Sequence, residues 1–282
     1  MIDSKKLEEY NKLRETINLV SVEQAKEIYE LMYVTDLVFT KFDIEYSLHF
    51  GSILGAIRNG GLIPWDDDVD IMTFYPDDRK LFKKEVVGEF NKYGMNVFIQ
   101  TTKKGRNTIK NSDGTIVNGV YKEQNPKFLN NKIIKINRRT MWKTLVPSAN
   151  GGGFLNEGTP LRLSNTSVLD IFPVKKKPHS DLWGNGYSRY KNNSYMSAEE
   201  IWPLKKTKFG SIDVSIVNKP EKLCKRWMGE TCLKEAKWTH SHTFWPSKED
   251  KKFVEENSDS LVNLEVPCLF DPVKFMRVNS VY

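Results

Sequence analysis

The chain has 282 residues, of which 39% are hydrophobic and 12% aromatic, and its net charge is +7. This length fits one large domain, and the aromatic content excludes a chain that is disordered throughout. The sequence contains no apolar run near the roughly 20 residues of a membrane span, and its charged first residues lack a signal-peptide core. We therefore expect a protein without a membrane span, located in the cytoplasm.

The cysteines, Cys224, Cys232 and Cys268, are odd in number and widely spaced, which argues against a disulfide framework and suits a reducing compartment. A zinc site with His240 and His242 is disfavoured. Eight helical residues separate the first two thiols by about 12 Å, too far to share one tetrahedral ion. We expect buried, unreactive thiols.

The excess of basic residues suits an anionic partner, which can be a nucleotide, a nucleic acid or an acidic glycan. The sequence has no helix-turn-helix signal, zinc-finger spacing or RNP aromatic motif, so nucleic-acid binding is disfavoured. It also lacks a Walker loop, which argues against a P-loop kinase or ATPase.

The first part of the chain alternates helices and strands, which predicts an α/β (α+β) core. A second helix is expected to begin at Ser21, because the string SVEQ resembles a capping box, and to end near Thr40. The expected elements are helix 4–17, helix 21–40, strand 44–50, short helix 52–58, strand 68–75, helix 77–90 and strand 95–99.

The second part of the chain is less regular. Residues 101–165 are polar, and we expect an inserted segment with short strands. We expect the whole chain, 1–282, to form a single domain that begins with an N-terminal helix within 1–20. The other expected elements are a strand at 167–174 that ends at Pro173, a hairpin at 201–217 that turns near Gly210, a helix at 219–236 that starts with Pro220, and a short helix at 247–256.

The string GSILGAIRNGGLIPWDDDVDIM, residues 51–72, holds four aspartates within five positions. Side chains two apart in a strand share a face, so Asp68 and Asp70 point to one side and Asp66 joins them where the strand begins. Carboxylates spaced by about 6.5 Å at their α-carbons hold hard cations, so we expect Mg²⁺ or Mn²⁺ here. The alternative is a solvated acidic loop.

Asp170 stands alone in the apolar string VLDIFP. An isolated carboxylate in such a strand is costly unless it is paired or binds a metal. An adjacent strand would bring it beside Asp68 and Asp70. The alternative is a strand-end aspartate that accepts a backbone hydrogen bond.

The strings FGS and DVDI resemble the signature of the polymerase-β-like nucleotidyltransferase superfamily. The longer string at 51–71 resembles its LicD/fukutin branch, as do LDIFP and the segment WPLKKTKFGSIDVSIVNKPEKLCKRWMG. The match covers about residues 20–75 and 165–235, so residues 101–165 carry no resemblance.

The resemblance implies a small mixed sheet flanked by helices, a divalent metal and a phosphotransferase activity. LicD-like members move phosphocholine from CDP-choline to a sugar, fukutin-like members move ribitol phosphate from CDP-ribitol, and fungal relatives are implicated in mannosyl phosphorylation. The expected partners are therefore a nucleotide-diphosphate donor, CDP-linked, and a glycan acceptor.

Roles follow for single residues. Asp68, Asp70 and Asp170 are the expected metal ligands; Asp170 is also a candidate base, and Asp66 a candidate base or second-metal ligand. The backbone at Gly51 and the hydroxyl of Ser52 are expected to contact phosphate, with help from Arg58. The alternative for Arg58 is a surface role, and Trp65 is a candidate for the pocket wall with core packing as its alternative. Weaker candidates for holding diphosphate or acceptor charge are Lys205 and Lys206.

Two other functions remain open. The first is a nucleotidyltransferase that adds NMP from an NTP to a small molecule, protein or RNA with the same carboxylates. The second is a non-catalytic basic module that binds nucleic acid, with salt-sensitive and metal-independent affinity.

Overall fold

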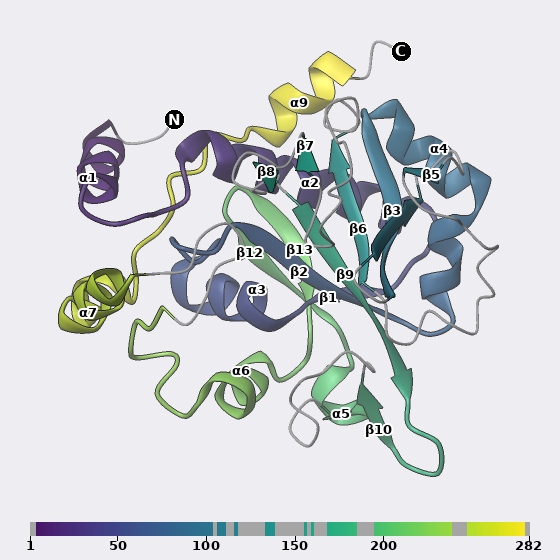
Figure 1. Ribbon diagram of the computed structural model, residues 1–282. Coiled ribbons are helices and arrows are strands. Elements are labelled where there is room, and N and C mark those ends of the chain that lie inside the picture. The colour runs from purple at the N-terminus through teal and green to yellow at the C-terminus, as the bar shows by residue number, and fades with distance from the viewer. Residues whose placement is uncertain are drawn as a thin grey trace.

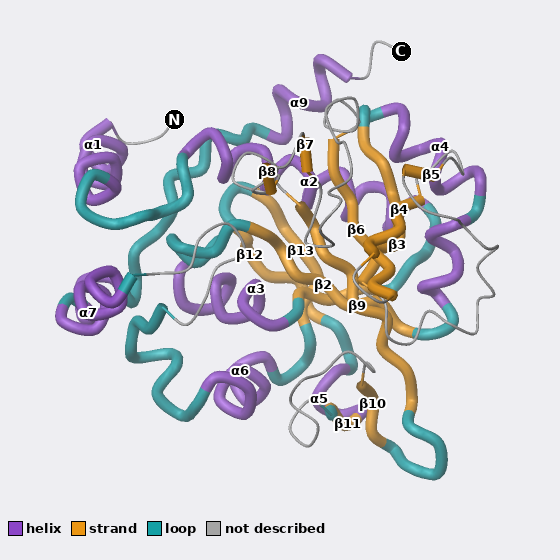
Figure 2. The backbone as a smooth tube through the Cα atoms, viewed as in Figure 1, coloured by secondary structure: helices purple, strands orange, loops and turns teal. Residues whose placement is uncertain are grey.

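A computed structural model describes residues 4–103, 106–110, 116–117, 133–138, 155–156, 159–160, 168–184, 195–238 and 247–279. Within these residues a curled mixed sheet is flanked by helices (Figures 1 and 2), which confirms the predicted α/β class. The strands of this sheet run in the order β1 (Tyr46–Leu48), β2 (Asp68–Phe74), β9 (Val168–Lys176), β6 (Ile133–Arg138), β3 (Met95–Lys103), β4 (Arg106–Lys110) and β5 (Ile116–Val117).

Smaller strands extend this framework. β9 continues beyond the sheet into a hairpin with β10 (Leu182–Gly184), which pairs with β11 (Met196–Ser197) and projects from the body in Figure 2. A separate hairpin joins β12 (Lys205–Phe209) to β13 (Ile212–Ile216) through Gly210, whose φ of 61° suits glycine. β7 (Leu155–Asn156) pairs with β8 (Thr159–Pro160). The predicted hairpin and its turn near Gly210 are thus confirmed, but the hairpin begins at Lys205 because Ile201 ends the helix α5 (Ala198–Ile201).

The helices begin close to the predicted positions. Ser21 caps α2 by accepting a 3.0 Å hydrogen bond from the Gln24 N–H, and Pro220 opens α6. α6 ends at Met228, earlier than predicted, because Gly229 leaves the helix with φ of 98°. The helices are α1 (Ser4–Arg14), α2 (Val22–Lys41), α3 (Phe50–Leu54), the π-helix η1 (Gly55–Asn59), the 3₁₀-helix η2 (Asp77–Phe82), α4 (Lys84–Lys92), α5 (Ala198–Ile201), α6 (Pro220–Met228), α7 (Lys248–Glu256), α8 (Ser258–Leu261) and α9 (Pro272–Asn279).

Two parallel strands, β2 and β9, form the centre of the sheet and set the orientation of the acidic side chains. Val69 and Ile71 on β2 are fully buried, and α2 packs against both strands. Because side chains alternate along a strand, Asp68 and Asp70 point to the opposite face. α3 contacts β2, and α6 in turn packs against α3.

Two predictions about strands need correction. β9 does not end at Pro173, as predicted, but continues to Lys176. On one side β2 still pairs with residues 173 and 174 of β9, whereas on the other side the pairing with β6 ends at Ile171. A proline lacks the N–H that a further partner would need, but none is required there. Residues 133–138, expected inside an insertion, form β6 and lie between β9 and β3. Part of that segment therefore builds the central sheet.

The thiols lie in apolar surroundings among the described residues. Cys224 and Cys232 are buried and Cys268 is half-buried, and burial raises the pKa of the first two above the usual range. A raised pKa keeps a thiol protonated and unreactive at neutral pH. His240 and His242, the other candidate zinc ligands, lie outside the described residues.

Candidate functional site

Three carboxylates converge at the centre of the sheet. Asp70 and Asp170 are register partners on the parallel strands β2 and β9, and Asp68 lies two residues before Asp70 on the same face. One carboxylate oxygen from each residue lies within 4.8 Å of the others. Asp68 and Asp170 are buried, at 6% and 3% exposure. The predicted convergence of these three side chains is thus confirmed.

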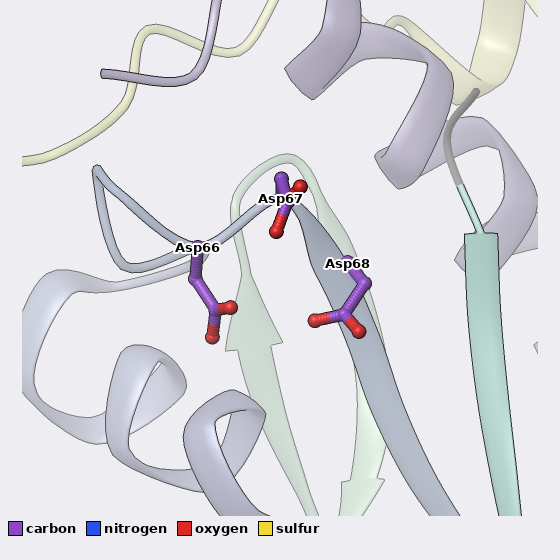
Figure 3. A group of neighbouring side chains, drawn as sticks. All are labelled: Asp66, Asp67 and Asp68. Carbon is purple, nitrogen blue, oxygen red and sulfur yellow. The ribbon is translucent and has the colours of Figure 1, made fainter. Parts of the chain in front are cut away.

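Asp66 and Asp67 extend the acidic group on the loop that leads into β2. Figure 3 shows the carboxylates of Asp66 and Asp68 pointing toward one another, and oxygens of all three residues lie within 4.8 Å. Burial of the Asp66 carboxylate, followed by repulsion from Asp68 and Asp67, raises the pKa of Asp66 well above its ordinary value. This side chain therefore holds a proton more readily than a free aspartate.

Gly51 and Ser52 contact the acidic residues directly. A Cβ built on Gly51 would lie 2.5 Å from Oδ2 of Asp66, so the missing side chain leaves room for that carboxylate. Ser52 is buried, and its Oγ accepts a 2.9 Å hydrogen bond from the Asp70 N–H. Both residues position carboxylates; their predicted contact with phosphate stays a prediction.

Arg58 and Trp65 lie within packed surroundings. The Arg58 guanidinium donates to the carbonyl oxygens of Cys232 and Glu235 at 3.1 and 3.2 Å, and it lies 5.9 Å from the Trp65 ring centroid. Burial lowers the pKa of Arg58 to about 10. Trp65 is 4% exposed and stacks on Trp238. These contacts give both side chains a structural role, and no described contact supports substrate binding by them.

Lys205 and Lys206 belong to the β12–β13 hairpin, outside the sheet that carries the carboxylates. Lys205 donates to the Asn218 carbonyl at 2.7 Å, and Lys206 pairs with Asp36 at 2.8 Å. Both side chains are exposed. The structure does not bring them together with the three carboxylates through any described contact.

Sequence reasoning missed an aromatic cluster beside the acidic group, formed by His49, Phe50, Phe172 and Trp227. Ring centroids of neighbouring members lie 3.8–5.4 Å apart. Phe172 follows Asp170 by two residues and so shares its face of β9, a relationship that strand alternation alone indicates. Trp227 comes from α6, more than 50 residues later, and no sequence pattern links it to this site.

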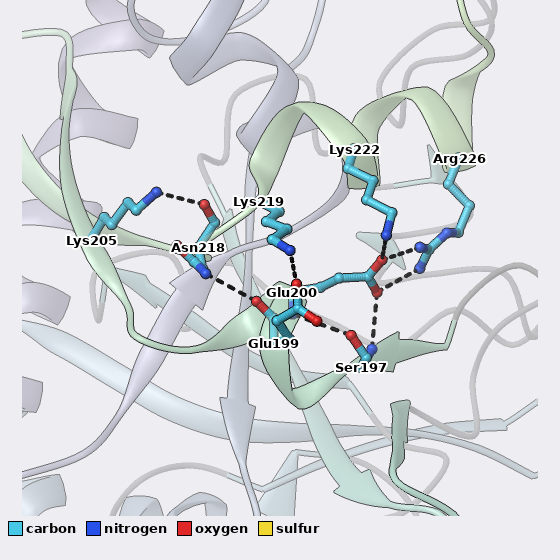
Figure 4. Close-up of polar contacts among 8 residues, drawn as sticks. All are labelled: Ser197, Glu199, Glu200, Lys205, Asn218, Lys219, Lys222 and Arg226. Carbon is cyan, nitrogen blue, oxygen red and sulfur yellow. Dashed lines mark hydrogen bonds and ion pairs between the residues drawn. The ribbon is translucent and has the colours of Figure 1, made fainter.

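An ionic network fixes α6 to α5, as Figure 4 shows. Glu200 accepts hydrogen bonds from the Ser197 N–H and from Arg226 Nη1, at 2.9 and 3.0 Å, and pairs with Lys222 at 2.9 Å. The Glu200 side chain is 4% exposed. Although burial alone would raise its pKa, Arg226 and Lys222 stabilise the anion and lower the pKa of Glu200 to about 2. The network thereby holds the helix that carries Trp227.

The three central carboxylates fit a divalent cation. They supply only oxygen ligands, and the oxygens lie close enough to share one ion. Hard cations such as Mg²⁺ prefer such oxygens, and a bound cation would offset the repulsion between the buried charges. Nothing in the donor set favours zinc, which prefers nitrogen and sulfur ligands.

Comparison with known proteins finds a family that resembles part of this chain. Residues 43–157 match the family model described as "LicD/FKTN/FKRP, nucleotidyltransferase domain". This part of the chain is therefore similar to the nucleotidyltransferase domain of that family. The match includes α3, β2 and β6, and thus part of residues 101–165, for which the sequence motifs gave no resemblance. Asp170 follows the matched range, so its place in the site depends on the strand register.

Individual relatives match parts of the chain. An uncharacterized protein of Rickettsia prowazekii is 33% identical over 196 residues, or 69% of this chain and 51% of the relative. One from Rickettsia typhi is 33% identical over 78 residues, or 28% of this chain and 25% of the relative. The lipopolysaccharide cholinephosphotransferase LicD of Haemophilus influenzae is 55% identical over 31 residues, or 11% of this chain and 12% of that protein. The chain thus spans about half the length of these relatives or less.

No helix among the described residues combines the length and apolar character that crossing a bilayer requires.

Proposed function

We propose that this protein is a metal-dependent transferase that moves a phosphate-linked group from a nucleotide-diphosphate donor to a glycan hydroxyl. We propose a CDP-linked donor and a transferred group of the phosphocholine, ribitol phosphate or sugar phosphate type. The convergence of Asp68, Asp70 and Asp170 within 4.8 Å carries the proposal. The LicD/FKTN/FKRP match and the similarity to a cholinephosphotransferase support it.

In the proposed reaction a hydroxyl oxygen of the acceptor attacks the distal phosphorus of the donor. A new P–O bond forms, the bond between that phosphorus and the bridging oxygen breaks, and a nucleoside monophosphate leaves. Asp68, Asp70 and Asp170 would hold Mg²⁺ or Mn²⁺, which when bound neutralises charge on the phosphates. The hydroxyl proton passes to a carboxylate, for which Asp66 and Asp170 are the candidates.

Two scaffold residues support this arrangement. Ser52 holds the Asp70 backbone through its 2.9 Å hydrogen bond, and Gly51 leaves room for the Asp66 carboxylate. Such contacts fix the carboxylates before the donor arrives, and preorganisation of this kind lowers the reorganisation that the reaction requires.

The test is release of a nucleoside monophosphate from a panel of CDP-, UDP- and GDP-linked donors in the presence of Mn²⁺. We expect CMP release from a CDP-linked donor, its loss with EDTA, and a loss of at least about 100-fold in Asp70→Asn and Asp170→Asn. Asp213→Asn, which changes an exposed aspartate on β13, is the matched control and should retain activity. Full activity of the Asp70 variant in EDTA would overturn the proposal.

A second candidate is a nucleotidyltransferase that attacks the α-phosphate of an NTP. The description of the matching family as a nucleotidyltransferase domain favours it. The same carboxylates would serve, but the released group would be pyrophosphate. Incubation with labelled NTPs separates the two reactions: pyrophosphate without CMP release would support this candidate and overturn the first.

A further inference from the structure

The aromatic cluster has a buried part and a partly exposed part. His49 and Phe172 are 2% and 5% exposed, whereas Phe50 and Trp227 are half-buried. The rings of Phe50 and Trp227 lie 5.4 Å apart with an interplanar angle of 62°. The buried pair thus supports the two rings that reach the surface.

This cluster borders the carboxylates on two strands. The His49 N–H donates to the Asp70 carbonyl at 2.9 Å, which places Phe50, the next residue, beside β2. Phe172 follows Asp170 by two residues on the same face of β9 and contacts the Phe50 ring at 5.3 Å. A ligand phosphate held near Asp70 and Asp170 would therefore bring the rest of the ligand close to these rings.

The backbone at Phe50 is unusual. Its φ is 37°, in the left-handed region that bulky side chains rarely adopt. A residue held in this region costs stability and persists where the surrounding structure fixes it, which is frequent at ligand sites. Here the strained residue directs a large ring toward Trp227 at the edge of the acidic group.

Two basic residues near Trp227 on α6 are engaged in ion pairs. Arg226, adjacent to Trp227, pairs with Glu200, as does Lys222. The exposed part of the cluster therefore offers aromatic faces and edges, which suits a flat, uncharged ring more than a phosphate.

We propose that Phe50 and Trp227 form a stacking surface for the nucleobase of the nucleotide donor. The inference rests on the proposed function, because the carboxylates must bind the diphosphate through a metal for the base to reach the rings. Stacking of a base on an aromatic side chain tolerates different bases and needs no hydrogen-bond readout. The two residues would determine affinity for the nucleotide, and the carboxylates would hold its phosphates.

The experiment compares binding of CDP with binding of inorganic pyrophosphate, both with Mn²⁺, by titration calorimetry. We expect Trp227→Leu and Phe50→Leu to weaken CDP binding by about 5- to 150-fold, which corresponds to about 1–3 kcal/mol. Pyrophosphate binding should not change, and Trp227→Phe should keep part of the CDP affinity. Trp183→Leu is the matched control, because Trp183 is also half-buried in a different aromatic group, with Trp202.

Other results of these titrations would contradict the proposed stacking surface. Unchanged CDP affinity in both leucine variants overturns the stacking surface while leaving the proposed function intact. Equal weakening of CDP and pyrophosphate also overturns it, because the rings would then act only by supporting the carboxylates. Phosphocholine is titrated in the same way: if the leucine variants weaken its binding and leave CDP binding unchanged, the surface belongs to the transferred group and the nucleobase proposal is overturned. Absence of both CDP and pyrophosphate binding in the wild type would overturn the proposed function and this inference with it.

Discussion

The hydroxyl of Ser52 accepts a 2.9 Å hydrogen bond from the backbone N–H of Asp70, and the carbonyl of Asp70 accepts one from the His49 N–H at the same distance. Both backbone polar groups of Asp70 are therefore bound by the segment that begins α3. This arrangement joins the loop before α3 to the strand that carries two of the three central carboxylates, and it fixes the position of Asp70 relative to Asp170.

Replacement of Ser52 by alanine should therefore disturb the site without removing a carboxylate. Ser52→Ala leaves the Asp70 N–H without its partner, and we expect a loss of about 1–3 kcal/mol in the free energy of unfolding together with weaker Mn²⁺ binding. Urea denaturation and Mn²⁺ titration measure the two effects. Ser47→Ala is the control, since the buried Ser47 hydroxyl donates to the Leu48 carbonyl and not to Asp70. Equal Mn²⁺ affinity in the two variants would contradict the positioning role.

Gly51 gives a second prediction about positioning. In Gly51→Ala the new methyl group would lie 2.5 Å from the Asp66 carboxylate, which must rotate away. Because only the end of a side chain moves, we expect less than about 1.5 kcal/mol of destabilisation but at least a tenfold loss of turnover. The control is Gly88→Ala on α4, where nothing lies within 4 Å and alanine should stabilise the helix by about 1 kcal/mol. Wild-type turnover in Gly51→Ala would show that the position of Asp66 is unimportant.

The strand periodicity predicted the central carboxylates because alternation in β2 and β9 is a local property. Asp68, Asp70 and Asp170 each follow from counting along one strand, and the pairing of the two strands then brings them together. The same counting places Phe172 on the face of Asp170. The spacing also predicted a divalent metal, and the family resemblance added the chemistry that spacing alone leaves open, namely a phosphate-linked substrate.

Contacts distant in sequence could not be predicted in this way. The sequence analysis predicted a phosphate contact for Arg58. Its partners in the structure, the Cys232 and Glu235 carbonyls, lie more than 170 residues away and could not be foreseen from the local sequence. Trp227 shows no pattern that links it to Phe50. The central place of β6 also depends on pairing with β9 and β3, whereas its polar surroundings in the sequence suggest a peripheral loop.

Arg58 now allows a test of its two possible roles. If it joins η1 to residues 232–235, Arg58→Gln should lower the free energy of unfolding by about 1.5–3 kcal/mol, because charge-assisted hydrogen bonds to part-buried carbonyls are lost. Pyrophosphate affinity in the presence of Mn²⁺ should then stay close to that of the wild type. The opposite result, unchanged stability with at least tenfold weaker pyrophosphate binding, would restore the predicted phosphate contact. Lys225→Gln, a change on the half-buried face of α6, serves as the control.

The buried carboxylates should also couple metal binding to stability. Mn²⁺ at about 100 times its dissociation constant should raise the free energy of unfolding by about 2.7 kcal/mol in the wild type and much less in Asp170→Asn. Without metal, Asp170→Asn should be more stable than the wild type, because the substitution removes repulsion among charges whose oxygens lie within 4.8 Å. Thermal denaturation with Mn²⁺ and with EDTA measures both effects. Identical shifts in the two proteins would place the cation elsewhere.

The ionic network around Glu200 predicts how stability depends on pH. Arg226 and Lys222 lower the pKa of Glu200 from its ordinary value near 4.5 to about 2 in the folded protein. The unfolded state therefore binds the proton first as the pH falls, so the stabilisation is complete above about pH 5 and is lost between about pH 4.5 and 2. Glu200→Gln should lack this contribution: it should be less stable than the wild type at pH 7, and the difference should shrink toward pH 3. Urea denaturation at several pH values measures it, with Glu199→Gln, which changes an exposed partner of Lys219, as the control. A difference between the wild type and Glu200→Gln that stays constant from pH 7 to pH 3 would contradict the ionic basis of the contact.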